Sequence, residues 1–359
     1  MLKIYKKYLI KKYLSYLLQI SMIFFILSII MGLVEELKFF TDIEAEYYLP
    51  YLLIVLNIPN LIYEIFPFCV LLAIIWFFLS LKNNNELSTF KYNGLNNSKL
   101  LILLTSVTLF IGFLMIVIFY NFSAILKKNY LDIKKSYTND NKYLASITEN
   151  GLWIKDENID NIFFVNASSI DKNQLMNVNI ILLDKNFRYL SMIFANNIDI
   201  ENNEWQIKNA SILDVNNKLT SKKNIEFKTN FNFEKINSLY TNLYALSIWE
   251  LYKLKKDYQS VNYSTADIDL HFQKILSYPF FLTVMSILSC VFMMNIQNFD
   301  NKIFVFTFGI ILSVSIYYIN NFFSILGKSE KVPIIFSVWI PILILFIISL
   351  IGVVRINEK

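Results

Sequence analysis

The sequence predicts a polytopic membrane protein with six transmembrane helices and one large water-exposed β domain inserted after the third helix. Of its 359 residues, 55% are hydrophobic and only 17% are charged, whereas soluble domains carry about 25% charged residues. Six apolar stretches are each long enough to cross about 30 Å of hydrocarbon at about 1.5 Å per residue. A polar region, 121–274, separates the first three stretches from the last three.

The predicted spans contain neither Lys nor Arg. They are Leu14–Val34, Leu61–Leu81, Leu100–Tyr120, Ile275–Met294, Ile303–Ile325 and Pro333–Val354. Glu64 is the only acidic residue inside a span, and it lies near a span end, where a carboxylate can reach the interface. The apolar segment Tyr47–Ile58 is too short to cross, so we expect it to lie at the interface or to extend the second helix. The chain therefore divides into residues 1–120, 121–274 and 275–359.

The distribution of positive charge predicts the orientation. One set of short loops and tails holds eleven Lys and Arg residues, and the opposite set holds three. Because cytoplasmic loops are enriched in positive charge, the first set is expected inside. Both termini are then cytoplasmic, and the domain is outside, in the periplasm of a double-membraned bacterium. The apolar run after the Lys-rich start is long and is followed by Glu35 and Glu36, so we expect a retained first helix rather than a cleaved signal.

Short β-like runs separated by polar turns fill the central region. The expected strands include Leu152–Ile154, Ile162–Val165, Val178–Leu183, Tyr189–Phe194, Ile198–Ile200 and Trp205–Ile207. Strands at this spacing favour a sandwich or an open barrel. Trp153 and Trp205 are expected in its core. Ile181 and Phe194 are expected to point inward, where an open interior would let them contact acyl chains.

The sequence argues against several kinds of chemistry. The central region holds 19 basic and 18 acidic residues, which does not favour a nucleic-acid surface. Cys69 and Cys290 both lie in apolar stretches, and with a single His no metal cluster is expected. Gly327-Lys328-Ser329 resembles the end of a phosphate-binding loop, but Phe322 stands where its first Gly is required. We therefore expect no catalytic residue, metal or cofactor, and an energy source outside this chain.

The loop between the second and third spans contains a short helix signal near 84–94. Asn84 or Asn85 suits an N-cap, Glu86 suits the positive helix end, and Gly94 suits the C′ position. Leu87, Phe90 and Lys91 would share one face at this spacing. Such a capped helix is a surface that a cytoplasmic motor could grip, although it is equally compatible with a connector that has no partner.

The chain resembles the LptF/LptG permeases of lipopolysaccharide export. Asn85-Glu86-Leu87-Ser88-Thr89-Phe90-Lys91-Tyr92-Asn93-Gly94 is similar to their Ser-Glu-Leu-x-x-x-Arg-x-x-Gly pattern, with Asn for Ser and Lys for Arg. Lys274 and Pro279 resemble the family's pattern at the fourth span, and Val332-Pro333 with Trp339-Ile340-Pro341 resembles its last helix. Gly151–Asp156 and Ala245–Ile248 favour LptG over LptF.

This resemblance implies a permease subunit of an ABC-type exporter in the inner membrane. It implies a periplasmic β-jellyroll-like domain, and an ATPase coupling role for Glu86, Leu87, Phe90, Lys91 and Gly94. The implied partners are an LptF-like permease, an LptB-like ATPase dimer, LptC/LptA-like periplasmic components and lipopolysaccharide, with no nucleic acid. Lys38 is the candidate for holding lipid phosphates near the outer end of the first helix, although Glu35, Glu36 and Asp42 surround it.

The alternatives at this point are two other classes of membrane protein and a scaffold that has no transport role. A MacB- or FtsX-like ABC permease would have four spans, with the large domain directly after the first. A membrane receptor with a periplasmic ligand-binding domain would usually carry a cytoplasmic output domain, whereas the longest inside segment here is the loop 82–99. Three predicted spans before the domain and the short inside loops favour the exporter.

Overall fold

The computed structural model describes residues 4–357 except 42, 44, 138–151, 158–160, 172, 216–217, 234–235, 237–241, 261–262 and 296–301. The chain folds as two compact units. The helical unit comprises Met1–Tyr130, Tyr244–Ile248 and Ala266–Lys359, and the β unit comprises Leu131–Leu243 and Trp249–Thr265.

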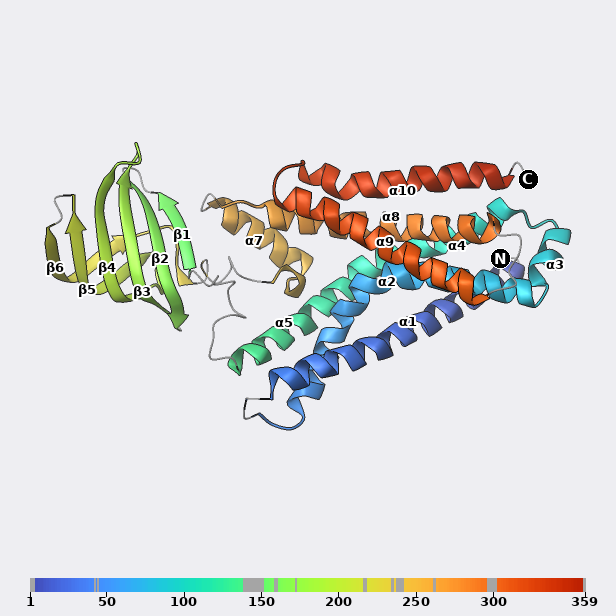
Figure 1. Cartoon of the computed structure of the whole chain (residues 1–359), viewed down its shortest axis with the longest axis horizontal. Helices are drawn as coiled ribbons and strands as arrows, with labels where there is room; N and C mark the ends of the chain where they lie inside the picture. Colours follow the sequence, from blue (N-terminus) through green and yellow to red (C-terminus); the bar gives the residue numbers. More distant parts are fainter. Residues whose placement is uncertain are drawn as a thin grey trace. The chain divides into compact units, whose positions relative to one another are not determined.

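Within the described residues, six helical segments are long and apolar enough to cross a membrane, which confirms the predicted class (Figure 1). They are α1 (Ile4–Phe39), α2 (Leu49–Asn83), α4 (Asn97–Leu114) with its continuation, α8 (Ala266–Asn295), α9 (Lys302–Lys328) and α10 (Ile334–Asn357). The segment α4 continues through the π-helical turn η1 (Met115–Tyr120) into α5 (Asn121–Ser136). Both termini and the short helix α3 (Glu86–Tyr92) lie at the same end of the helical unit (Figure 1).

Helices α2 and α8 form the buried centre of the helical unit, whereas α1, α9 and α10 expose much of their apolar surface. The Ser289 hydroxyl of α8 donates to the Leu71 carbonyl of α2 at 2.7 Å. Gly112 lets α4 approach α8 closely, because a Cβ atom there would lie 2.7 Å from the Cα of Pro279. Most of the apolar segment Tyr47–Ile58 belongs to α2, which begins at Leu49. The segment therefore extends the second helix, which was one of the two arrangements expected.

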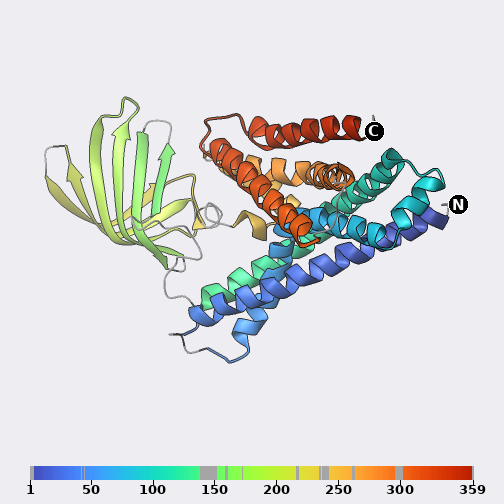
Figure 2. The ribbon, with the colours of Figure 1, turned by 45° about the vertical axis from the view of Figure 1, so that its right-hand side comes forward.

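The β unit contains one antiparallel sheet whose six strands are ordered as in the sequence (Figures 1 and 2). The strands are β1 (Leu152–Glu157), β2 (Asn161–Asp171), β3 (Gln174–Asp184), β4 (Tyr189–Asp199), β5 (Glu204–Asp214) and β6 (Leu219–Lys228). The prediction of an inserted antiparallel β domain is confirmed, and its connectivity is a simple meander. The turn η3 (Leu243–Ala245) and helix α7 (Ile248–Ser260) follow in the chain before α8.

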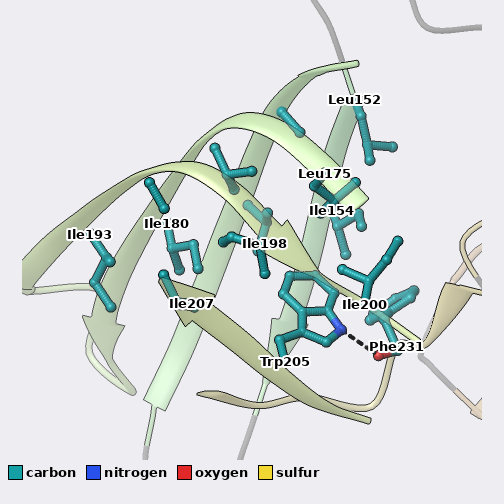
Figure 3. Packing of buried hydrophobic residues seen from close by; sticks show 14 of the residues in the cluster. Leu152, Ile154, Leu175, Ile180, Ile193, Ile198, Ile200, Trp205, Ile207 and Phe231 are labelled. Atoms are coloured by element: carbon teal, nitrogen blue, oxygen red, sulfur yellow. Dashed lines mark hydrogen bonds between the residues drawn. The ribbon is translucent and has the colours of Figure 1, made fainter. Parts of the chain in front are cut away.

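One face of the sheet is covered by a buried apolar cluster (Figure 3). Trp205 is fully buried in it, and its indole Nε1 donates to the Phe231 carbonyl at 2.8 Å. The expectation for Trp153 was wrong, because its side chain is 52% exposed. Side chains alternate between the two faces of a strand, so Leu152 and Ile154 point into the cluster and Trp153 points away.

The two edges of the sheet are tied together by a polar contact at one end. Asp156 of β1 accepts hydrogen bonds from the Thr229 hydroxyl at 2.6 Å and from the Asn230 backbone at 2.8 Å. Thr229 and Asn230 directly follow β6, so this buried carboxylate holds the segment that carries Phe231 against the core. Ile198 of the expected strand Ile198–Ile200 lies at the end of β4, which stops at Asp199, so Ile200 follows the strand; Gly151 lies outside the described residues.

Candidate functional site

The loop between α2 and α4 folds into α3, Glu86–Tyr92. Asn85, one of the two residues expected as the N-cap, occupies that position with φ 56°, and its side chain makes no capping hydrogen bond. The Asn85 carbonyl, and not its side-chain amide, contacts the first turn of the helix. That carbonyl accepts hydrogen bonds from the Ser88 and Thr89 hydroxyls, both at 2.9 Å.

The other end of α3 is closed by a Schellman motif. Gly94 has φ +83°, and its amide donates to the Lys91 carbonyl at 3.0 Å. The Leu95 amide donates to the Phe90 carbonyl, also at 3.0 Å, and Leu95 is buried. A residue with a Cβ would be strained at this φ, which explains why a Gly stands here.

Helix α3 is anchored to α1 through Glu86. The Lys12 ammonium donates to Glu86 Oε2 at 2.7 Å and to Oε1 at 2.8 Å, and the Tyr8 hydroxyl donates to Oε2 at 3.0 Å. The two charged side chains are only 12% and 23% exposed, so water screens them incompletely. Both carboxylate oxygens of Glu86 are therefore already hydrogen-bonded to residues of α1, and these contacts orient α3 against that helix.

The other predicted coupling residues lie on two faces of α3, one packed against the helical unit and one exposed. Leu87 and Phe90 are half-buried, and the Phe90 ring lies 6.2 Å from the ring of Tyr8. Lys91 is exposed, and Tyr92 is 91% exposed at the end of the helix. The face available to another protein thus combines the outer parts of Leu87 and Phe90 with Lys91 and Tyr92.

Sequence reasoning missed Lys12, Tyr8 and Tyr92 as parts of this site. Lys12 and Glu86 are far apart in the sequence, and each alone resembles an ordinary loop or helix-end charge. The available signal was that Tyr8 and Lys12 share one face of α1 by i, i+4 spacing. An exposed aromatic residue at a helix end was the signal for Tyr92.

Lys38, the candidate for binding lipid phosphates, lies exposed in the last turn of α1. Of the acidic residues around it in the sequence, Glu36 is buried and accepts a hydrogen bond from the Tyr130 hydroxyl at 2.7 Å. Glu35 is exposed, and Asp42 lies outside the described residues. Glu36 is therefore buried and does not lie on the exposed surface where Lys38 lies.

Ile181 and Phe194 lie on the sheet face opposite the apolar cluster, so the expectation that they point inward was wrong. The strand pairing aligns Ile180 with Ile193 on the cluster face, and Ile181 with Met192 on the other. A shift of one residue exchanges the two faces of a strand. The runs Val178–Leu183 and Tyr189–Phe194 are apolar at most positions, so their pattern alone did not fix which side chains point inward.

In the described part of the chain, six helices able to span a membrane, with an antiparallel β domain inserted after the first three, define a multi-pass membrane protein with a large inserted domain. Among the described residues, no group of His, Cys, Asp and Glu is placed to hold a metal ion. The family model of the lipopolysaccharide export system permease LptF/LptG matches residues 7–355, nearly the whole chain. The chain therefore belongs to the LptF/LptG family, and lipopolysaccharide export as a permease is its function at the family level. A search of the curated proteins gave no match.

Proposed function

We propose that this chain is an LptG-like subunit of an ATP-driven exporter. It extracts lipopolysaccharide from the outer leaflet of the inner membrane and passes the lipid to a periplasmic bridge. Its partners in this proposal are an LptF-like permease, an LptB-like ATPase dimer and LptC/LptA-like periplasmic components. The exposed apolar faces of α1 and α9 provide surface for lipid and for the second permease.

Extraction of a lipid with several acyl chains requires an external source of energy. Each methylene group removed from hydrocarbon costs about 0.8 kcal/mol. The sequence contains no complete phosphate-binding loop, since Phe322 replaces the first Gly. The work must therefore come from a partner that contacts this chain.

The proposal is supported chiefly by the way α3 is attached to α1. It is a capped helix, held on α1 by Glu86 and Lys12, and it presents Lys91 and Tyr92 outward. A force applied to this exposed face passes directly to α1 through the ion pair. The excess of positive charge in the loops at this end supports a cytoplasmic position, where an ATPase is accessible.

Alanine substitution at Phe90 and Tyr92 tests the coupling role. The paired variant Phe90→Ala, Tyr92→Ala removes two aromatic side chains from the proposed interface. Truncating an interface hot spot commonly costs about 2 kcal/mol or more, which corresponds to about 30-fold in affinity. We expect reduced co-purification of the ATPase and reduced ATP-dependent release of lipopolysaccharide, while the chain still inserts into the membrane.

Tyr47→Ala is the matched control, because Tyr47 is a similarly exposed tyrosine, 86% accessible, in the loop before α2. It should leave both measurements unchanged. If the paired variant retains both at wild-type levels, α3 is a connector and the coupling proposal fails.

In this proposal the apolar cluster face of the β unit receives the acyl chains. Trp205 and Phe231 fill that face, so acyl chains require the segment after β6 to move away. A photo-crosslinker at Leu182, which is half-buried against the cluster, should capture lipopolysaccharide during ATP hydrolysis. The same crosslinker at Ile181, the next residue on the opposite face, should not. Equal capture at both positions would exclude a selective path along this face.

A further inference from the structure

The helical unit contains a cavity of about 220 Å³ that is separate from α3. Its walls come from α2, α8, α9, α10 and η3. Its polar lining includes Tyr63, Glu64, Lys274, Asn320 and Asn321. Sites for drug-sized ligands measure about 300–1,000 Å³, so this cavity suits a smaller group.

Two polar groups that line the cavity have no hydrogen-bond partner within the described part of the chain. The Tyr63 side chain is only 7% exposed, and its hydroxyl is unsatisfied. The Lys274 ammonium forms neither a hydrogen bond nor an ion pair within 4 Å with the residues that the structure describes. An unsatisfied buried donor is costly, by about 1–3 kcal/mol and more for a charged group. The buried Tyr63 hydroxyl therefore calls for a hydrogen-bond acceptor, and the half-buried Lys274 ammonium in the same cavity favours an acceptor that carries negative charge.

The cavity also offers a negative group. Glu64 faces it, and one carboxylate oxygen, Oε1, accepts from the Asn60 amide at 3.1 Å. Lys274 lines the same cavity as Glu64. A ligand bound here thus meets a basic and an acidic side chain in the same small space.

In the spans predicted from the sequence, the polar residues of the cavity lie close to one boundary of the hydrocarbon. Tyr63 and Glu64 are in the first turn of the apolar stretch that begins at Leu61, and Lys274 directly precedes the stretch that begins at Ile275. Ser337, another lining residue, is in the first turns of α10. Headgroup regions occupy about 5–7 Å on each side of the hydrocarbon. Tyr317 lines the cavity and is 50% exposed, so one wall of the cavity is formed by a residue on the outer surface of α9.

We propose that this cavity binds the zwitterionic headgroup of a membrane phospholipid of the phosphoethanolamine class. Its phosphate oxygens accept hydrogen bonds from the Lys274 ammonium and the Tyr63 hydroxyl. Its amine donates to Glu64, and its acyl chains leave along the exposed surface beside Tyr317. The proposal rests on the position of these helices in the membrane. It is independent of which face is cytoplasmic and of coupling to an ATPase.

Binding can be measured on the full-length chain, purified in detergent and freed of phospholipid. Native mass spectrometry with short-chain phosphatidylethanolamine, short-chain phosphatidylglycerol, sodium phosphate and lipopolysaccharide gives an apparent affinity for each. We expect phosphatidylethanolamine to bind at least about ten-fold more tightly than phosphatidylglycerol, because a charge-assisted hydrogen bond to Glu64 is lost with the second lipid.

Single substitutions test which side chains of the cavity contact the headgroup. Tyr63→Phe and Lys274→Gln should each weaken phosphatidylethanolamine binding by about ten-fold or more. Tyr63→Phe removes no hydrogen bond that the hydroxyl forms with the described residues, so the fold should survive it. Glu64→Gln should abolish the preference for phosphatidylethanolamine over phosphatidylglycerol. Tyr318→Phe and Lys331→Gln, at exposed positions on and after α9, are the matched controls and should change nothing.

Several results would overturn the proposal. Equal affinity for the two phospholipids, or wild-type affinity in both Tyr63→Phe and Lys274→Gln, removes its basis. Sodium phosphate binding as tightly as phosphatidylethanolamine would define an inorganic anion site instead. Binding of lipopolysaccharide without binding of phosphatidylethanolamine would assign the cavity to the transported lipid.

Discussion

Replacing Lys12 by Gln removes the cation that holds α3 against α1. Lys12 Nζ lies 2.7 and 2.8 Å from the two carboxylate oxygens of Glu86, and the side chains are 12% and 23% exposed. A hydrogen bond to a charged group contributes about 1.5–3 kcal/mol, whereas an exposed ion pair contributes about 0–1 kcal/mol. This partly buried pair lies between the two cases. We expect Lys12→Gln to destabilise the docked state of α3 by about 1–2 kcal/mol, or about 5–30-fold in its opening equilibrium.

The same contact predicts a dependence on pH. Burial opposes ionisation of Glu86, but hydrogen bonds from Lys12, Asn84 and Tyr8 outweigh it and hold the pKa of the carboxyl below its ordinary value of 4.5. A depressed pKa in the docked state stabilises docking above pH 4.5. That stabilisation is lost as the pH falls through the lowered pKa. Lys12→Gln should therefore reduce the loss of docking on acidification.

Hydrogen exchange of the amides in residues 86–95, followed by mass spectrometry on the full-length chain, measures this opening. Lys11→Gln is the matched control, because Lys11 is an exposed neighbour on the same helix. Exchange in the control should match that of the wild type. If Lys12→Gln also exchanges at the wild-type rate, the ion pair does not hold α3, and force transfer through it is excluded.

Two further pairs of substitutions test the packing of each unit. Trp205→Ala should destabilise the β unit by about 3–5 kcal/mol, since it empties the core and leaves the Phe231 carbonyl without its indole donor. Trp153→Ala, at an exposed position, should cost far less, and limited proteolysis of the full-length chain distinguishes the two. Gly112→Ala should separate α4 from α8 and lower the thermal stability in detergent, because the added Cβ meets the Pro279 backbone at 2.7 Å. Gly32→Ala is its control, with the nearest atom at 3.7 Å, and should be tolerated. Equal effects within either pair would contradict the packing described here.

The membrane architecture followed from the sequence because its signal is local. A span needs about 20 consecutive apolar residues, and six such runs can be counted without knowing any tertiary contact. The position of α3 was equally local, since Glu86 and Gly94 mark the ends of a short helix. The inserted β domain was predicted from short apolar runs that alternate with polar turns.

Contacts between distant residues could not be predicted in the same way. The ion pair of Lys12 with Glu86 joins residues separated by 74 positions, and nothing in either local segment specifies the other. The inward faces of β3 and β4 were assigned incorrectly because most positions there are apolar. No alternation of polar and apolar residues therefore indicated which side chains point toward the core. Strand β6 was not predicted at all. It is an exposed edge strand that contains Lys222 and Lys223. Charged residues keep such an edge from pairing with another chain, but they also interrupt the alternation of apolar residues by which a strand is predicted.

We propose that α3 meets a cytoplasmic motor while the β unit works on the other side of the membrane. Single cysteines at Asn84 and Asn202, both exposed, report these two sides in a chain whose buried Cys69 and Cys290 are replaced by Ser. A membrane-impermeant maleimide added to intact spheroplasts should label Asn202→Cys, and should label Asn84→Cys only after the membrane is permeabilised. The reverse pattern would place the β unit in the cytoplasm and would contradict both the orientation and the proposed export mechanism.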